Sequence, residues 1–298
     1  MIAETTTGKT EWAFDEGDEI APGLTALRLL GGGWRYEAYL AFDERLHYPV
    51  VVKAIRPDQV HDEGALRGLR REIDVLERVN HPVIARMLGA RPDGPRPFIE
   101  LEHVEGPRLS SLIRRHGPLE IDQVGPLAAE LGAALHSLHT DGLVHLDVKP
   151  KNTIMGAPPR LIDLSIARTI ERAKTTDHPL GTDAYMAPEQ CIPEQGLPMQ
   201  PASDVWGLGV TVYEALSGTL PFGRGVDDDA APPEKRWPQL EREPEPLSPR
   251  LPAGVNATIW ACLEPAPADR PTAREVAEAM EPLLARPRKL VLNHLRPR

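Results

Sequence analysis

Cysteine is scarce in this 298-residue sequence, which contains only Cys191 and Cys262. Two cysteines cannot build a disulfide framework, so we expect a protein of a reducing compartment. The two cysteines and ten histidines also lack CxxC, HExxH or similar spacings of metal ligands. These patterns therefore give no indication of a zinc site.

Excess positive charge and long apolar runs are lacking as well. Lysine and arginine total 34 against 44 aspartates and glutamates, a net charge of −10, and an acidic chain is poorly suited to bind nucleic acid without sequence preference. The uncharged run 205–213 is short, whereas a membrane helix needs about 20 residues. Residues 1–4 do not begin a signal peptide. We expect a cytoplasmic protein with no membrane span and no nucleic-acid partner.

The spacing of apolar residues divides the chain into a strand-rich part and a helix-rich part. Proline is the abundant exception, with 32 residues, and it crowds 232–252, where we expect mostly loop. Strands are predicted at 24–30, 37–42, 49–55 and 98–102, and helices at 65–79, 123–139, 204–216, 256–263 and 273–284. This order predicts an α+β fold of two lobes, and the cleft between two lobes is the default ligand site.

A glycine turn follows the first long strand, at Leu30, Gly31, Gly32 and Gly33. Glycines allow backbone N–H groups to approach a phosphate closely. A tight hairpin explains three glycines equally well. Both interpretations stay open on this segment alone.

The strongest motif runs from His145 to Asn152 and is followed by Asp163. Asp147, Asn152 and Asp163 supply a base and two oxygen ligands for a hard cation, and Mg²⁺ prefers such oxygens together with substrate phosphates. Lys149 lies two residues after Asp147 and could neutralise a phosphoryl group in transfer. The pattern indicates phosphoryl transfer.

With these motifs, residues 24–285 resemble a eukaryotic-like (Hanks-type) Ser/Thr protein kinase of bacteria. The resemblance implies a two-lobed protein-kinase-like fold, whose N-lobe is an antiparallel β-sheet plus one helix and whose C-lobe is mainly α-helical. It divides the chain into an N-terminal extension at 1–23, an N-lobe at 24–103, a C-lobe at 104–285 and a basic tail at 286–298.

The resemblance also implies a role for each site residue, with ATP and Mg²⁺, or Mn²⁺ in its place, as cofactors. Asp147 is the catalytic base, Lys149 assists it, Lys53 pairs with Glu72, and Asn152 and Asp163 are the metal ligands. Glu189, Asp204 and Arg270 support the site, Arg270 by pairing with Glu189 and Asp204 by anchoring the catalytic loop. The nucleotide-binding residues implied are Leu30, Gly31, Gly32, Gly33, Ala38, Val51, Lys53, Leu101, Glu102, Val104 and Ile154.

Three positions depart from the family pattern. Tyr36 stands where the glycine loop has its third glycine, so we expect an altered approach to the phosphates. Leu164-Ser165 follows Asp163 in place of Phe-Gly, and Leu146 precedes Asp147 in place of the arginine that binds an activation-loop phosphate. A non-RD enzyme of this kind is not expected to depend on that phosphate. Thr169, Thr175 and Thr176 are candidate phosphosites or plain loop threonines.

The function expected is a Ser/Thr protein kinase that transfers the γ-phosphoryl of Mg-ATP to protein hydroxyls. The alternative is a pseudokinase that binds nucleotide or a regulatory partner without transfer, and a third reading is a small-molecule phosphotransferase of the aminoglycoside-kinase type. The partners expected are a protein substrate and either a second copy of the chain or a regulatory protein. The tail 286–298 is expected to be a solvated end or a dock for an acidic partner.

Overall fold

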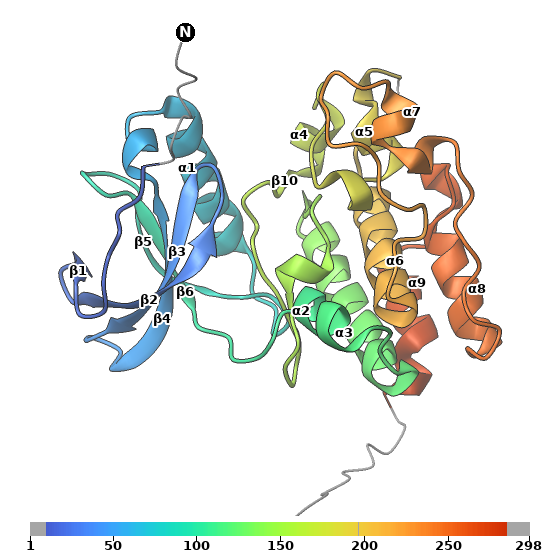
Figure 1. The fold of residues 1–298 in the computed structure, drawn as a ribbon, viewed down its shortest axis with the longest axis horizontal. Helices are drawn as coiled ribbons and strands as arrows, with labels where there is room; N and C mark the ends of the chain where they lie inside the picture. The colour runs from blue at the N-terminus through green and yellow to red at the C-terminus, as the bar shows by residue number, and fades with distance from the viewer. Residues whose placement is uncertain (1–9, 196, 285–298) are drawn as a thin grey trace, which may run out of the picture.

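The computed structural model describes residues 10–195 and 197–284, which form two lobes (Figure 1). Residues 10–102 form the strand-rich lobe, and the helix-rich lobe follows. The predicted two-lobed α+β architecture is therefore confirmed. The tail 286–298 lies outside the described residues.

The N-lobe is an antiparallel sheet of six strands in the order β1-β2-β3-β4-β6-β5. The glycine turn joins β2 to β3. Helix α1 (Glu63–Arg78) packs on the sheet through Leu69, Ile73 and Leu76, and the Asp62 carboxylate caps its first turn. The strands are β1 (Glu19–Ala21), β2 (Leu24–Gly32), β3 (Tyr36–Asp43), β4 (Tyr48–Ile55), β5 (Met87–Arg91) and β6 (Phe98–Glu102).

The C-lobe is built from helices and two short β-ladders. Its helices are α2 (Leu109–His116), α3 (Ile121–Thr140), α4 (Ile170–Lys174), α5 (Pro188–Cys191), α6 (Pro201–Ser217), α7 (Pro233–Arg236), α8 (Ala253–Cys262) and α9 (Ala273–Met280). Strand β7 (Leu143–Val144) pairs with β10 (Arg168–Thr169), and β8 (Thr153–Ile154) pairs with β9 (Arg160–Leu161). No helix in the described ranges is both long and apolar enough to cross a membrane.

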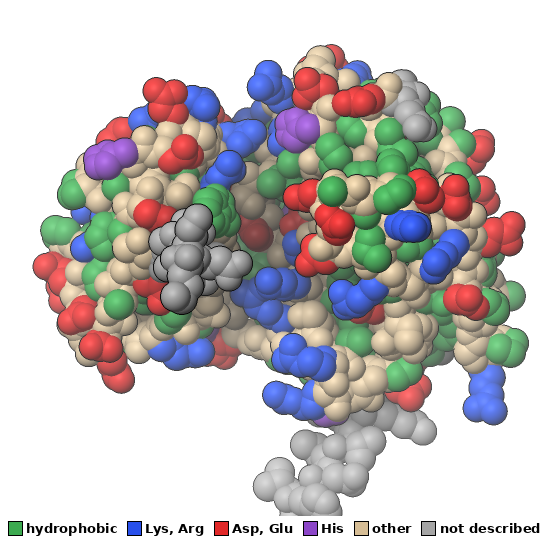
Figure 2. Space-filling model, turned by 45° about the horizontal axis from the view of Figure 1, so that its top comes forward, with side chains coloured by type: hydrophobic (Ala, Val, Ile, Leu, Met, Phe, Trp, Pro, Cys, Tyr) green, Lys and Arg blue, Asp and Glu red, His purple; other side chains and the backbone are tan. Residues whose placement is uncertain are grey.

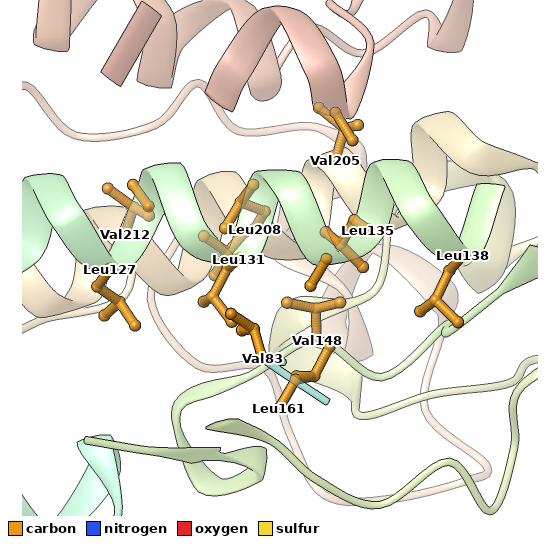
Figure 3. Close-up of a cluster of buried hydrophobic side chains, with 14 of the residues drawn as sticks. Val83, Leu127, Leu131, Leu135, Leu138, Val148, Leu161, Val205, Leu208 and Val212 are labelled. Atoms are coloured by element: carbon orange, nitrogen blue, oxygen red, sulfur yellow. The ribbon is translucent and has the colours of Figure 1, made fainter. Parts of the chain in front are cut away.

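Helices α3 and α6 form the centre of the C-lobe core (Figure 3). Leu127, Leu131, Leu135 and Leu138 are spaced by three or four residues and so share one face of α3. Each of these leucines is at most 2% exposed, and full burial of a leucine contributes about 1.5–3 kcal/mol. Val148, immediately after Asp147, enters the same cluster. The catalytic loop is thereby packed directly onto the core.

The described part of the N-terminal extension packs against the sheet. The Trp12 indole N–H donates to Ile55 O at 2.8 Å, and the Trp12 and Phe14 rings stack with centroids 6.0 Å apart. The Arg96 guanidinium lies 4.4 and 4.6 Å from these two rings. Sequence periodicity did not predict these contacts, because the segment is neither strand nor helix. The predicted long elements differ from the observed ones by a few residues at their ends.

Candidate active site

A lysine, a glutamate and an aspartate from three different elements meet at the base of the cleft between the lobes. Lys53 Nζ in β4 lies 2.8 and 2.9 Å from the two carboxylate oxygens of Glu72 in α1. The same ammonium lies 2.8 Å from Oδ1 of Asp163, which follows β9. The space-filling view shows the cleft as a hollow between the lobes (Figure 2). The pairing of Lys53 with Glu72 across 19 residues is thus present.

One positive charge faces two carboxylates in this group. Burial lowers the pKa of Lys53, but attraction by Asp163 and Glu72 outweighs it and raises that pKa above its usual range. Burial raises the pKa of Asp163, and the Lys53 ammonium overcomes this and holds it well below its usual range. Burial raises the pKa of Glu72 despite Lys53. The surplus of negative charge favours a cation beside Asp163.

Three donors hold the carboxylate of Asp147. Lys149 Nζ lies 2.6 Å from Oδ2, and Asn152 Nδ2 lies 3.0 Å from the same oxygen. The Thr182 hydroxyl donates to Oδ1 at 2.7 Å and accepts from Lys149 Nζ at 2.5 Å. The predicted residues Asp147, Lys149 and Asn152 are therefore brought together, with Thr182 joining them from the activation segment.

Asp204 fixes the backbone on which Asp147 sits. Its carboxylate accepts from the backbone N–H of His145 at 2.9 Å and of Leu146 at 2.6 Å, and it lies 2.9 Å from His139 Nε2. Leu146 has a φ of 65°, in the left-handed region that is unfavourable for leucine. The Asp204 hydrogen bonds hold this residue in that conformation immediately before Asp147.

The side-chain oxygens of Asn152 and Asp163 are of the kind that a magnesium ion binds. The Asn152 amide nitrogen donates to the backbone oxygen and the carboxylate of Asp147, so its side-chain oxygen is the atom left for a cation. The Asp163 side chain is 37% exposed at the cleft and ionised. Two such oxygens suit Mg²⁺, which keeps waters and substrate phosphates among its ligands.

One face of the N-lobe sheet carries several of the side chains that are predicted to bind the nucleotide. Ala38 lies opposite Lys53 in the β3–β4 pair, and Val51 lies opposite Leu101 in the β4–β6 pair. Facing residues of antiparallel strands point to one side, as do residues i and i+2 of a strand, so all four share the face of Lys53. The predicted apolar lining residues are half-buried, as the wall of an open cleft requires: Leu30, Ala38, Val51, Leu101, Val104 and Ile154.

The glycine loop is attached to the sheet by an ion pair that sequence reasoning missed. Gly31, Gly32 and Gly33 are exposed at the end of the β2–β3 hairpin. Arg56 Nε donates to Gly33 O at 2.8 Å, and Arg56 Nη1 lies 2.7 Å from the buried Glu37 carboxylate. A charged residue just beyond a strand carries no motif, so no sequence signal identified this pair.

The segment after β6 joins the two lobes. The Glu102 carboxylate lies 3.2 Å from Arg86 Nη2 and 3.5 Å from Arg160 Nε. Ile154, in the C-lobe strand β8, forms an isolated bridge with Arg108. The Glu102 side chain thus ties the end of β6 to the residue before β5 and to β9.

A buried ion pair closes the C-lobe below the activation segment. Arg270 donates to both oxygens of Glu189 at 2.7 and 2.9 Å, and both side chains are fully buried. The Ser203 hydroxyl donates to the same carboxylate at 2.7 Å. The expected pairing of Arg270 with Glu189 is thus present, and it supports the segment without contacting the cleft residues.

An apolar cluster occupies the position where a phosphate-binding arginine was missing. Leu146 is 3% exposed and packs with Val144, Ala173 and Met199. Ala173 belongs to α4, so the cluster fastens the activation segment to the catalytic loop. Hydrophobic packing thus contributes to holding this segment in place, and independence of a phosphate there stays a prediction.

The three candidate phosphosites take part in local hydrogen bonds. Thr169 caps α4 by accepting from Arg172 N at 3.2 Å, and Thr175 donates to Arg172 O at 3.2 Å. Thr176 accepts from Arg168 Nη1 at 2.8 Å. Burial, together with neighbouring arginines, lowers the pKa of Arg168 to about 10. These threonines have structural partners, and their phosphorylation stays a prediction.

Comparison with known proteins gives the family. Residues 24–280 match the model of the protein kinase domain. The chain is 33% identical over 255 residues to a probable Ser/Thr protein kinase, PkwA of Thermomonospora curvata, covering 83% of this chain and 32% of that protein. It is 32% identical over 255 residues to the Ser/Thr protein kinase PknB of Mycobacterium tuberculosis, covering 81% and 40% of the two chains.

A third relative has a similar extent. The Ser/Thr protein kinase PkaA of Streptomyces coelicolor is 32% identical over 242 residues, which cover 78% of this chain and 42% of that protein. The match thus spans about a third to two fifths of the length of these relatives. The chain belongs to the protein kinase family and is a catalytic domain of the bacterial Hanks type.

Proposed function

We propose that the chain is an active Ser/Thr protein kinase domain that transfers the γ-phosphoryl of Mg-ATP to a protein hydroxyl. The observation that carries the proposal is the simultaneous presence of two assembled groups. Lys53 contacts both Glu72 and Asp163, while Asp147 is held by Lys149, Asn152 and Thr182. A protein that only bound nucleotide would have no need of the second group.

The residues of the chain supply position and charge. Lys53 holds the α- and β-phosphates while Glu72 fixes its ammonium, and Asp147 accepts the proton of the acceptor hydroxyl. That oxygen forms a bond to the γ-phosphorus as the bond to the leaving ADP oxygen breaks, and Lys149 stabilises the charge that develops. Mg²⁺, when bound through Asn152 and Asp163, neutralises phosphate charge.

The pseudokinase alternative rests on Tyr36, Leu146 and Leu164-Ser165. Leu146 packs in the cluster that orders the activation segment. Ser165 contributes a hydrogen bond that lowers the pKa of Asp163, alongside the larger effect of Lys53. Tyr36 contacts α1 while Lys53 keeps both carboxylate partners. These contacts favour catalysis by a non-RD enzyme, with Asp163-Leu164-Ser165 at the metal site, over binding of nucleotide without transfer.

The experiment that tests this function is transfer by the purified chain with Mg²⁺, ATP and a basic protein as acceptor. We expect phosphoserine or phosphothreonine in the acceptor by mass spectrometry, and a loss of about 10²- to 10⁴-fold in Asp147→Asn, which removes the base. Absence of transfer with ADP still bound would support the pseudokinase. Transfer only to small alcohols or aminoglycosides would support a small-molecule kinase.

The finer expectations about partners are part of this proposal. A protein substrate follows from the proposed reaction, while a second copy of the chain or a regulatory protein remains the predicted source of control. A cytoplasmic location is proposed on the composition alone. Size-exclusion chromatography with light scattering measures the mass of the chain in solution and so tests pairing with a second copy. A monomer mass would count against pairing of the isolated chain.

A further inference from the structure

The aromatic side chain at the altered glycine-loop position reaches helix α1. Tyr36 is the first residue of β3 and lies opposite Ile55. It lies two positions before Ala38 in the strand, so its side chain shares the sheet face that carries Lys53. Its hydroxyl donates to Ala65 O, in the first turn of α1, at 3.2 Å. The residue thus connects the glycine-loop hairpin with the helix that carries Glu72.

Gly68 makes room for this contact. A Cβ atom at Gly68 would lie 3.0 Å from the Tyr36 hydroxyl oxygen, closer than ordinary van der Waals contact. Glycine inside a helix costs about 1 kcal/mol relative to alanine, so the Tyr36 hydroxyl gives a physical reason for its presence in α1. Tyr36 and Gly68 therefore fit one another across the lobe.

The contacts that Tyr36 and Lys53 make with α1 lie on one side of the helix. Ala65, Gly68 and Glu72 are spaced by three and four residues, so they line one face, and all three are buried. Tyr36 contacts the first two, and Lys53 binds the third. Lys53 Nζ also lies 4.9 Å from the centre of the Tyr36 ring, within the range of a cation–π contact.

The Tyr36 hydroxyl is in the protonated state that it needs to donate a hydrogen bond to α1. Burial raises its pKa above the ordinary value, although the Lys53 ammonium opposes the shift. The hydroxyl is therefore protonated at physiological pH and donates to the Ala65 carbonyl. The ring packs against the apolar residues between the sheet and α1.

We propose that Tyr36 is a positioning residue that fastens α1 to the glycine-loop hairpin and so keeps Glu72 on Lys53 without a phosphate on the activation segment. This inference rests on the proposed function for its catalytic consequence. Its structural part concerns only the position of α1. Tyr36 does not itself transfer a proton or phosphate; it acts through Glu72 and Lys53.

The experiment compares Tyr36→Phe, which keeps the ring, with Tyr36→Ala, which removes it. We expect faster amide hydrogen exchange in α1 for both variants, stronger in Tyr36→Ala. For Tyr36→Phe, we expect kcat to fall about 2- to 10-fold, the effect of one neutral hydrogen bond, and Tyr36→Ala should lose more. Affinity for Mg-ADP should change less than 2-fold, because the adenine wall is untouched.

Tyr213→Phe is the matched control, because the Tyr213 hydroxyl donates to a backbone carbonyl, Glu245 O, at 2.9 Å in the C-lobe. Its α1 exchange and kcat should equal those of the wild type. A double-mutant cycle with Gly68→Ala adds a test from the other side. Gly68→Ala should impair transfer alone and cost less in the Tyr36→Ala background, where the clash is absent.

Unchanged exchange in α1 of Tyr36→Ala would overturn the proposal, whatever the activity. Tighter nucleotide binding with an undiminished kcat would also overturn it, because the ring would then be obstructing the phosphates. Should the wild type transfer no phosphate, the proposed function fails, and the exchange measurement still decides the role of Tyr36. Tyr36→Phe preserves the packing, so the test survives if Tyr36→Ala does not fold.

Discussion

Lys53 illustrates how a single side chain can support both the fold and the chemistry. Its ammonium contacts two carboxylates from different lobes, and its side chain is only 12% exposed. Sequence reasoning predicted the Glu72 contact through the family resemblance. The direct contact with Asp163 joins the two lobes.

Replacing Lys53 with methionine should therefore lower both activity and stability. Transfer should fall about 10²- to 10³-fold, because a preorganised charge at the phosphates is lost. Stability in urea should fall by about 3 kcal/mol at pH 7, because Glu72 and Asp163 lose their buried partner. Lys174→Met is the control, since Lys174 pairs only with the exposed Glu171 in the contacts described, and it should change stability by less than about 1 kcal/mol.

Glu100 is a buried carboxyl outside the active site. It lines a cavity of about 360 Å³ beside β5, together with Asp43, Arg45 and Arg91. Burial raises the pKa of Glu100 to about 7, aided by its hydrogen bond to Asp43 and partly offset by Arg45. Burial also raises the pKa of Asp43, but hydrogen bonds from Glu100 and the backbone overcome this and lower it. The proton of the pair resides on Glu100.

The contribution of Glu100 to the free energy of unfolding should therefore decline as pH rises from about 4.5 to about 7. In this window the folded chain retains a proton that the unfolded chain releases, so deprotonation favours unfolding. Glu100→Gln supplies a permanent donor to Asp43, and its stability relative to the wild type should increase across this window in urea titrations. Glu63→Gln, on the surface, is the control. A difference in stability between Glu100→Gln and the wild type that stays constant across this pH range would contradict the assignment.

Among the elements, the N-terminal segment contributes more than its lack of regular structure suggests. Thr10 O accepts from Arg56 Nη1 at 3.3 Å, and Arg56 in turn holds Gly33 O. Trp12 donates a hydrogen bond to Ile55 O, in the residue that precedes Arg56. A few residues without periodicity thus reach the glycine loop through one arginine.

Trp12→Ala should destabilise the chain by about 2–4 kcal/mol, since it removes a stacked, half-buried indole and its hydrogen bond. Thermal unfolding measures the loss. Trp34→Ala should stay within about 0.5 kcal/mol of the wild type, because a surface substitution has little effect and Trp34 is 58% exposed. Equal losses in the two variants would contradict a structural role for the segment.

Long periodic elements were the ones that the sequence could predict. The spacing of Leu127, Leu131, Leu135 and Leu138 predicted α3, and β-branched residues predicted β4. The short helices α2 and α4 escaped, because one or two turns contain too few apolar residues for a period. The contacts of Tyr36 and Arg56 were also not predicted, because they depend on how the hairpin and α1 are packed in three dimensions.

At the scale of the whole molecule, contacts between unmodified side chains hold each half of the site together. Lys53 bridges the lobes through Asp163, and Leu146 packs the activation segment against the catalytic loop. Thr182 completes the Asp147 group from the same segment. We therefore propose that the unmodified fold of this kinase domain already has the arrangement needed for transfer.

The most direct test is the initial rate of phosphoryl transfer by chain stripped of phosphate with a phosphatase and verified by intact mass. We predict linear transfer to a basic protein from the first turnovers, at a rate unaffected by preincubation with Mg-ATP. A lag that preincubation removes would contradict the claim that the unmodified site is complete. Absence of any transfer, with Mg-ADP still bound, would contradict the assignment as an active kinase.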